Sequence, residues 1–319
     1  MIAAVTLESL RAAARALEGV AVRTPMLDLP DLGARVGAPV ALKCELLQPT
    51  GAFKIRGAYN AVSRVAAQGG VPGVVTQSSG NHGQAVAFAA RRFGLRAVVV
   101  MPASTPSVKV EGVRRHGGEV VFAGATRSGE QGARAEAIAR DEGLAMIPPF
   151  NHPDVIAGQG TCGLEILEQR PDVRTILVPV SGGGLIAGIA VAVAALAPEV
   201  RVIGVEPAGA AKLTAALAAG APRTLEHTES IADGLLSRSV GDLTFDILRR
   251  VVREAVTVTE AEIADGVGYL HRHTDLRAEP SGAVAVAALL AGHVRPAGPA
   301  VAVVSGGNVD PELYQRLVG

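Results

Sequence analysis

The chain has 319 residues, of which 49% are hydrophobic and 19% are charged. This length and composition suit one large domain or two interleaved domains with a sizeable buried core, and they exclude a disordered chain. The 30 basic and 30 acidic residues balance, and only 3% of the residues are aromatic, so the composition indicates neither a nucleic-acid surface nor one for an anionic membrane.

Two cysteines, Cys44 and Cys162, lie far apart in the sequence and form no C-x-x-C motif. This argues against a disulfide framework or a zinc site and predicts two reduced, buried thiols. Residues 1–20 lack an apolar signal-peptide core, so we expect an amphipathic helix there. The longest apolar run, 185–197, is too short to span a bilayer. We therefore expect a soluble, cytoplasmic protein.

Short β-branched runs alternate with alanine-rich helical stretches along the chain. In chain order, the pattern predicts strands at 74–76, 97–101, 119–122, 175–180, 200–205 and 300–304, and helices at 85–93, 108–116 and 130–142, with a further helix after the glycines that follow the fourth strand. Continuous apolar strands that alternate with helices predict an α/β fold with mostly parallel sheets flanked by helices.

The proline-containing stretch 148–153 breaks the regular pattern and is predicted to mark a crossing between two lobes. We predict a large, discontinuous domain made of residues 1–71 and 148–319. A small α/β domain of residues 72–147 would be inserted into it.

Three loops carry small polar residues and glycines, and open α/β sheets bind ligands at the carboxyl ends of their strands. The first loop, 181–185, reads Ser-Gly-Gly-Gly-Leu and joins a strand to a helix. Its glycines let backbone N–H groups approach an oxyanion at a helix N-terminus, which favours a phosphate site. The Rossmann and Walker A patterns are both missing. A tight turn that binds nothing is the alternative interpretation.

The second loop, 78–83, reads Ser-Ser-Gly-Asn-His-Gly. Hydroxyl, amide and backbone N–H groups at a helix start can hold a carboxylate. An ordinary serine cap of the helix explains the same pattern equally well. His82 is either a general base or, more commonly for a single histidine in a turn, a structural residue.

The third loop, 51–58, places Lys54 between Phe53 and Ile55, and Lys54 is one of four lysines in the chain. Partial burial would lower the pKa of the Lys54 amine and free it for Schiff-base chemistry. An amine, a phosphate site and a carboxylate site together suit pyridoxal phosphate (PLP) and an amino-acid substrate.

With these loops in view, the sequence resembles the fold type II PLP enzymes of the serine/threonine dehydratase and serine racemase family. The resemblance implies a fold like that of the tryptophan synthase β-subunit, with two open, twisted sheets and a small lobe inserted in a large one. The matching segments occur in the order of the family over almost the whole chain: Arg23-Thr24-Pro25, 51–58, 78–85, 155–161, 179–188, 231–234, 279–283 and 305–308.

The resemblance also implies residue roles. Lys54 would bind the cofactor covalently and act as the catalytic base, with Ser79 as a second catalytic residue in a racemase. The other implied cofactor contacts are Phe53 and Asn81 at the ring, Gly182, Gly183 and Gly184 at the phosphate, Ser305 at the pyridine nitrogen and Glu279 near the ring. Leu185 and Gly306 are further implied cofactor-binding residues. The implied substrate-carboxylate contacts are Ser78, Ser79, Gly80, Asn81 and His82.

The activity implied is α,β-elimination from a small β-hydroxy amino acid, such as serine, threonine or a 3-hydroxy analogue, to a 2-keto acid and ammonia. A hydroxyl at the ring nitrogen does not keep that nitrogen protonated as a carboxylate would, which disfavours a long-lived carbanion. The alternative activity is amino-acid racemisation with Lys54 and Ser79 as opposing bases. A β-replacement synthase fits less well, since those relatives usually read Thr-Ser-Gly-Asn-Thr-Gly at 78–83. A non-catalytic PLP- or nucleotide-binding protein conflicts with the intact Lys54. We expect a homodimer.

The sequence departs from the family at a metal site. Many relatives carry acidic residues shortly after a Glu-Pro pair and bind a divalent cation there, but Glu206-Pro207 is followed by Ala-Gly-Ala-Ala-Lys. This argues against a divalent cation, so we predict no metal ligands. Lys212 would either supply a positive charge that pairs with Glu206 or lie in solvent. Glu130, where relatives often carry arginine, either faces solvent or indicates a non-acidic substrate side chain.

Overall fold

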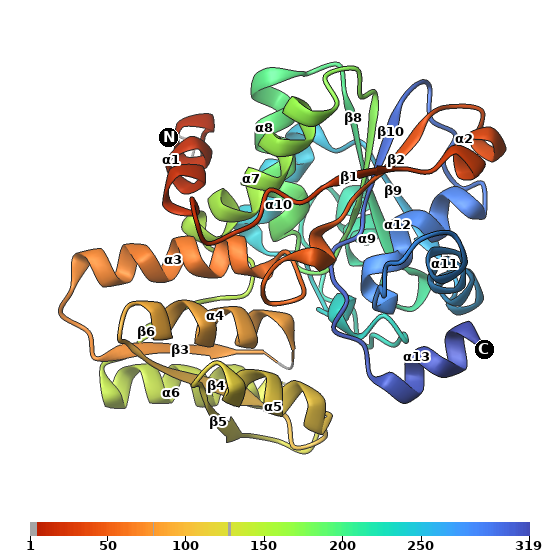
Figure 1. Ribbon diagram of the computed structural model, residues 1–319. Helices are drawn as coiled ribbons and strands as arrows, with labels where there is room; N and C mark the ends of the chain where they lie inside the picture. The colour runs from red at the N-terminus through yellow and green to blue at the C-terminus, as the bar shows by residue number, and fades with distance from the viewer. Residues whose placement is uncertain (1–4, 79, 127–128) are drawn as a thin grey trace.

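The computed structural model describes residues 5–78, 80–126 and 129–319, and its two sheets lie side by side (Figure 1). The larger sheet has the order β1-β2-β10-β7-β8-β9 and the smaller one β5-β4-β3-β6. The strands of the larger sheet are β1 Met26–Asp28, β2 Val40–Lys43, β7 Thr175–Pro179, β8 Arg201–Pro207, β9 Glu254–Val258 and β10 Ala300–Val303. Those of the smaller sheet are β3 Gly73–Gln77, β4 Arg96–Met101, β5 Glu119–Phe122 and β6 Ala145–Met146.

Only β1 runs antiparallel to its neighbour among the described strands, and all the other pairs are parallel. The predicted mostly parallel α/β fold is therefore confirmed. The strands that the sequence analysis did not predict are β1, β2, β6 and β9. Of these, β1 and β9 are partly exposed edge strands without the continuous apolar run of a central strand, and β6 has only two residues. Strand β2 is fully buried inside the larger sheet, but its apolar run is only Val40 to Leu42.

Helices cover both faces of each sheet (Figure 1). Against the larger sheet pack α1 Leu7–Ala16, α2 Pro30–Val36, α7 Pro153–Gln169, α8 Gly184–Leu196, α9 Lys212–Ala219, α10 Asp242–Val251, α11 Glu260–His273, α12 Pro280–Leu290 and α13 Pro311–Val318. Against the smaller sheet pack α3 Lys54–Gln68, α4 Asn81–Arg92, α5 Ser107–Arg115 and α6 Glu130–Glu142. Three short 3₁₀ helices complete the chain: η1 Glu45–Leu47, η2 Ala208–Ala210 and η3 Asp233–Leu235.

The larger sheet is built from both ends of the chain and the smaller sheet from residues 73–146. Helix α3 contacts both halves: its alanines share an apolar cluster with β3 and α4, and Gly57 lies so close to Gly158 of α7 that a Cβ on Gly158 would be 2.6 Å from the Gly57 Cα. The exact division of the chain at residues 71/72 and 147/148 stays a prediction.

The N-terminal helix and the hydropathy of the helices were also predicted from the sequence. Helix α1 starts with a reciprocal cap between Thr6 and Ser9, within the predicted N-terminal helix. In residues 5–78, 80–126 and 129–319, no helix combines the length and the hydropathy that a bilayer crossing requires.

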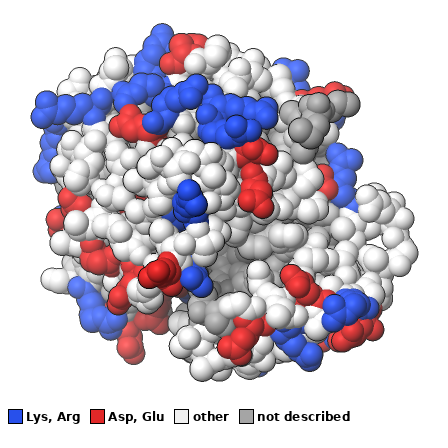
Figure 2. All heavy atoms as spheres, turned by 180° about the vertical axis from the view of Figure 1, so that it is seen from behind, with Lys and Arg blue, Asp and Glu red and all other residues white. Residues whose placement is uncertain are grey.

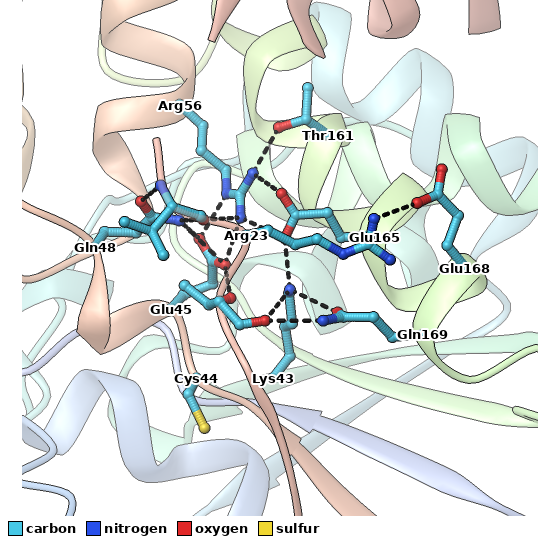
Figure 3. A network of polar contacts seen from close by, with 12 residues as sticks. Arg23, Lys43, Cys44, Glu45, Gln48, Arg56, Thr161, Glu165, Glu168 and Gln169 are labelled. Atoms are coloured by element: carbon cyan, nitrogen blue, oxygen red, sulfur yellow. Dashed lines mark hydrogen bonds and ion pairs between the residues drawn. The ribbon is translucent and has the colours of Figure 1, made fainter. Parts of the chain in front are cut away.

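A network of buried charges joins α3 to the larger sheet (Figure 3). The Arg56 guanidinium donates to both carboxylate oxygens of Glu45, at 2.7 and 2.8 Å, and to both of Glu165, also at 2.7 and 2.8 Å. Lys43 also donates to Glu165. Burial alone would raise the pKa of Glu45, but Arg56 beside it lowers that pKa below its ordinary value.

Arg56→Met should destabilise the fold strongly, because it leaves the buried carboxylate of Glu45 and the partly buried carboxylate of Glu165 with only Lys43 to balance them. We expect a loss of about 3–5 kcal/mol in the free energy of unfolding, measured in urea by circular dichroism. The matched control is Arg96→Met, since Arg96 also pairs with two glutamates but on the surface, where the expected loss is about 1 kcal/mol or less. Equal losses in the two variants would contradict the prediction.

Candidate active site

Two loops that are distant in sequence are joined by backbone hydrogen bonds beside Lys54. Phe53 N–H donates to the Ser305 carbonyl at 3.0 Å, and Ala52 forms an isolated antiparallel bridge with Gly306. Gly51 adopts a φ of 72°, and a Cβ there would lie 2.4 Å from the side-chain oxygen of Asn308, so only glycine fits this turn. The predicted cofactor residues Phe53, Lys54, Ser305 and Gly306 are thereby brought together.

Lys54 is the first residue of α3, and its side chain is half-buried. The amine donates to the Pro149 carbonyl at 2.9 Å and lies 5.1 Å from the centre of the Phe53 ring. Burial lowers the pKa of Lys54 to about 8. The Lys54 amine is therefore partly desolvated, as the sequence analysis expected, and its reactivity stays a prediction.

Pro149 and Phe150 connect the Lys54 amine to the glycine loop. The Phe150 ring packs so closely on Gly182 that a Cβ there would lie 2.3 Å from ring carbons. Gly183, at φ 92°, caps α8, and Thr244 donates to the Gly182 carbonyl at 2.8 Å. The loop therefore presents backbone N–H groups at the start of a helix next to an amine. The sequence analysis treated 148–153 only as a crossing and missed this contact.

Asn81, the first residue of α4, joins three further segments. Its amide donates to Glu279 Oε1 at 2.7 Å, and its side-chain oxygen accepts from Asn308 at 2.8 Å. Asn308 also donates to the Thr50 carbonyl at 2.9 Å. This chain of hydrogen bonds fixes the Asn81 side chain between the Lys54 loop and the start of α12.

Glu279 is a buried carboxyl group with a raised pKa. Burial, together with the charge of Asp233, raises the pKa of Glu279 to about 7 against the opposing effect of Lys109. A Cβ on Gly306 would lie 2.2 Å from Glu279 Oε1, so the glycine is required for this approach. Glu279 can therefore hold or release a proton near neutral pH.

The last three residues of the predicted loop 78–83 belong to helix α4. Helix α4 begins at Asn81 rather than near Ala85 because Ser78 Oγ accepts from the backbone N–H groups of Gly80 and Gly83, at 3.3 and 3.0 Å. The Ser78 hydroxyl is thus used in shaping the helix start, and its predicted contact with a substrate stays a prediction. Ser79, the predicted second catalytic residue, lies outside the described residues.

His82 is buried, and its Nε2 lies 3.0 Å from the Ile147 carbonyl, to which it donates. Burial, with the nearby Lys54 charge, lowers the pKa of His82 to about 3. This geometry supports the structural interpretation of the His82 side chain rather than a general base.

Lys109 of α5 reaches across to the other half of the molecule, and sequence reasoning did not assign it to the site. Its ammonium forms an ion pair with Asp233 of η3, and it lies beside Gly80, whose added Cβ would be 3.8 Å from Lys109 Nζ. The scarcity of lysine in the chain was the one signal that could have identified it. Lys109 therefore links α5 to η3 beside the start of α4.

Two residues left open by the sequence are now placed. Lys212 pairs with Glu206 at 3.4 Å, with both side chains fully buried, so the predicted pairing is confirmed and the solvated interpretation is wrong. Glu130 is exposed at the start of α6, as its solvent-facing interpretation requires.

The molecular surface carries both signs of charge. Figure 2 shows acidic and basic side chains around a central hollow, with most of the basic ones along the upper edge. On this face, the charge is therefore mixed rather than of a single sign.

The residues present fit pyridoxal phosphate: a half-buried amine of lowered pKa lies next to a glycine loop that has no room for side chains at Gly182. Fold and site thus define an enzyme that uses this cofactor. The chain belongs to the pyridoxal-phosphate dependent enzyme family, which residues 17–306 match.

Relatives of known activity cover almost the whole chain. An L-threonine ammonia-lyase of Thermotoga maritima is 42% identical over 315 residues, which is 98% of this chain and 78% of that protein. A serine racemase of Oryza sativa is 38% identical, with 98% and 95% covered. Among solved structures, maize serine racemase matches with a TM-score of 0.94 at 37% identity, over 98% and 97% of the chains.

These comparisons confirm the predicted family, its fold type II architecture and the dependence on pyridoxal phosphate. The two activities that the sequence predicts are those of the relatives. The individual roles assigned to Phe53, Asn81, Leu185, Ser305 and the other site residues stay predictions.

The lowered pKa of Lys54 predicts how the cofactor-free protein captures pyridoxal phosphate. Only a neutral amine attacks the aldehyde, so the capture rate should rise with pH and level off above about pH 8. Stopped-flow absorbance measures this rate. The amine of Nα-acetyl-lysine is the control, and its rate should keep rising because its pKa is about 10.4. The same pH profile for both amines would contradict the assignment.

Proposed function

We propose that the protein is a PLP-dependent ammonia-lyase that converts a small β-hydroxy amino acid, such as serine, threonine or a 3-hydroxy analogue, to a 2-keto acid and ammonia. The observation that carries the proposal is the Lys54 amine, whose pKa is lowered to about 8 by burial next to the Pro149–Phe150 segment that packs on the glycine loop. The Thermotoga maritima relative, an L-threonine ammonia-lyase, supports the reaction class.

The cofactor, when bound, supplies a ring that withdraws electrons from the substrate Cα. Lys54 would accept the Cα proton, because its pKa of about 8 makes the neutral amine far more abundant near neutral pH than that of an ordinary lysine. The N-terminus of α8 at Gly183 and Gly184 would hold the cofactor phosphate. Ser305, which is buried, would offer the ring nitrogen a hydroxyl rather than a carboxylate, which favours elimination over a long-lived carbanion.

The start of α4 would hold the substrate carboxylate. Its first N–H groups, at Asn81 and His82, have no partner inside the helix, and the helix dipole favours an anion there. Ser78 fixes this turn through its bonds to Gly80 and Gly83. Lys109, beside Gly80, adds a positive charge on the same side.

Racemisation of the same substrates is the second candidate, favoured by the match to maize serine racemase. It requires an acid/base on the face of the substrate opposite Lys54, a role that the family resemblance gives to Ser79. One site could support both reactions, because both begin with removal of the Cα proton.

We also propose a cytoplasmic homodimer. Buried, unpaired Cys44 and Cys162 suit a reducing compartment. The exposed side chains of Val22 and Leu47 lie on segments that Gln48 joins by hydrogen bonds, and they supply an apolar surface for a second copy. Light scattering tests the assembly, and a monomer at micromolar concentration would contradict it.

Lys54→Ala should lower keto-acid production by several orders of magnitude, because it removes both the cofactor attachment and the base. Keto-acid release from a panel of β-hydroxy amino acids measures the effect. Arg64→Ala is the control, since Arg64 is exposed on the same helix, and it should keep wild-type turnover. Retention of a tenth of the activity in Lys54→Ala would refute the assignment. A visible absorbance band that persists in Lys54→Ala would also do so.

Ser79→Ala should separate the two reactions. If Ser79 is the second acid/base, racemisation should fall far more than elimination, because only racemisation needs protonation from the opposite face. Chiral chromatography of the remaining amino acid and a keto-acid assay measure the two rates in one sample. Equal losses would show that Ser79 only positions the substrate.

A further inference from the structure

The Lys212 ammonium is buried in a cage of oxygen atoms at the carboxyl end of β8. It donates to the Ala210 carbonyl at 2.6 Å and to the Leu235 carbonyl at 2.8 Å. Glu206 Oε1 lies 3.4 Å away, and neither charged side chain is exposed. The ammonium thus contacts two carbonyl oxygens and a carboxylate, which are the kinds of oxygen ligand that proteins use to bind hard metal cations.

The Glu206 carboxylate also accepts hydrogen bonds from the first turn of α9. Its Oε1 accepts from Leu213 N–H at 2.8 Å, and its Oε2 accepts from the N–H and hydroxyl of Thr214 at 2.9 and 3.0 Å. A carboxylate at a helix N-terminus is favoured by the helix dipole. Burial lowers the pKa of Lys212 below its ordinary value, and Glu206 beside it opposes this shift.

A divalent cation does not fit this cage. Such an ion needs about six oxygen ligands at about 2.0–2.6 Å, usually with several carboxylates. The cage has a single carboxylate, and the ammonium already lies against its oxygens. Within residues 5–78, 80–126 and 129–319, no group of three or more His, Cys, Asp or Glu side chains is arranged to hold a metal.

We propose that Lys212 is a resident cation, built into the chain, which takes the structural place of a metal ion and makes the fold and the cofactor site independent of divalent cations. Lys212 is a positioning residue in this proposal, because it acts through the backbone of η3 rather than on substrate or cofactor.

The cage connects to the active site through the segment 233–237. Leu235, whose carbonyl binds Lys212, is the last residue of η3, and Asp233 at its start pairs with Lys109 across the site. Two residues after Leu235, the Ser237 hydroxyl accepts from Ser181, the first residue of the glycine loop 181–185. Release of the Leu235 carbonyl should therefore loosen both contacts.

The test compares the wild type with Lys212→Asp and Arg201→Met. Lys212→Asp removes the ammonium and adds a second carboxylate beside Glu206, so it should create a metal site. Arg201→Met is the control, because it removes a positive charge from the exposed end of the same strand. For each purified holoenzyme, the Tm and the dissociation constant of pyridoxal phosphate are measured in EDTA and then with magnesium or calcium, and bound metal is measured by elemental analysis.

The wild type and Arg201→Met should give the same Tm and cofactor affinity under all conditions, with no stoichiometric metal. Lys212→Asp in EDTA should melt several degrees lower and bind the cofactor more weakly, and added magnesium or calcium should restore both in a saturable way. A wild-type Tm that falls in EDTA and recovers with magnesium would overturn the proposal. So would a folded Lys212→Asp that ignores both cations. If Lys212→Asp does not fold, the wild-type measurement decides alone.

Discussion

The Arg56 guanidinium lies between the buried carboxylate of Glu45 and the partly buried carboxylate of Glu165, and the position of Lys54 two residues earlier depends on it. Glu45 follows β2, Glu165 belongs to α7 and Arg56 lies in the first turn of α3. None of these charges is stable in the interior without the others. The network therefore permits one register of α3 against the larger sheet, and the close approach of Gly57 to Gly158 leaves α3 no room to shift. The amine is fixed by charges that take no part in the proposed chemistry.

The four lysines of the chain differ in the partners of their buried or partly buried ammonium groups. Lys43 and Lys212 are fully buried against glutamates, and Lys109 pairs with Asp233. Lys54 donates to a backbone carbonyl, and in the described part of the chain no ion pair with a carboxylate is found for it. A neighbouring carboxylate favours the charged form of an amine, whereas burial disfavours it. Burial without a carboxylate partner lowers the pKa of Lys54 to about 8, which suits the proposed role of its amine.

Local patterns were enough to predict much of the architecture. The strand 119–122 and the helix 130–142 have the predicted bounds, because apolar period and composition are properties of neighbouring residues. The glycine loop 181–185 was also recognised from neighbouring residues, because its glycines directly follow a predicted strand. Edge strands such as β1 and β9 were missed, since their stability comes from one neighbouring strand rather than from their own sequence.

The sequence by itself determined the family and the cofactor, because these follow from residue types in a fixed order along the chain. It also singled out Lys54 as the proposed reactive lysine. Only the tertiary structure decided what surrounds them. The contact of Pro149 with Lys54, the pairing of Lys109 with Asp233 and the burial of Lys212 each join residues from distant segments. The burial of a group and its distance to other groups set its charge and reactivity. Both depend on how distant segments pack, so the neighbouring residues in the sequence do not determine them.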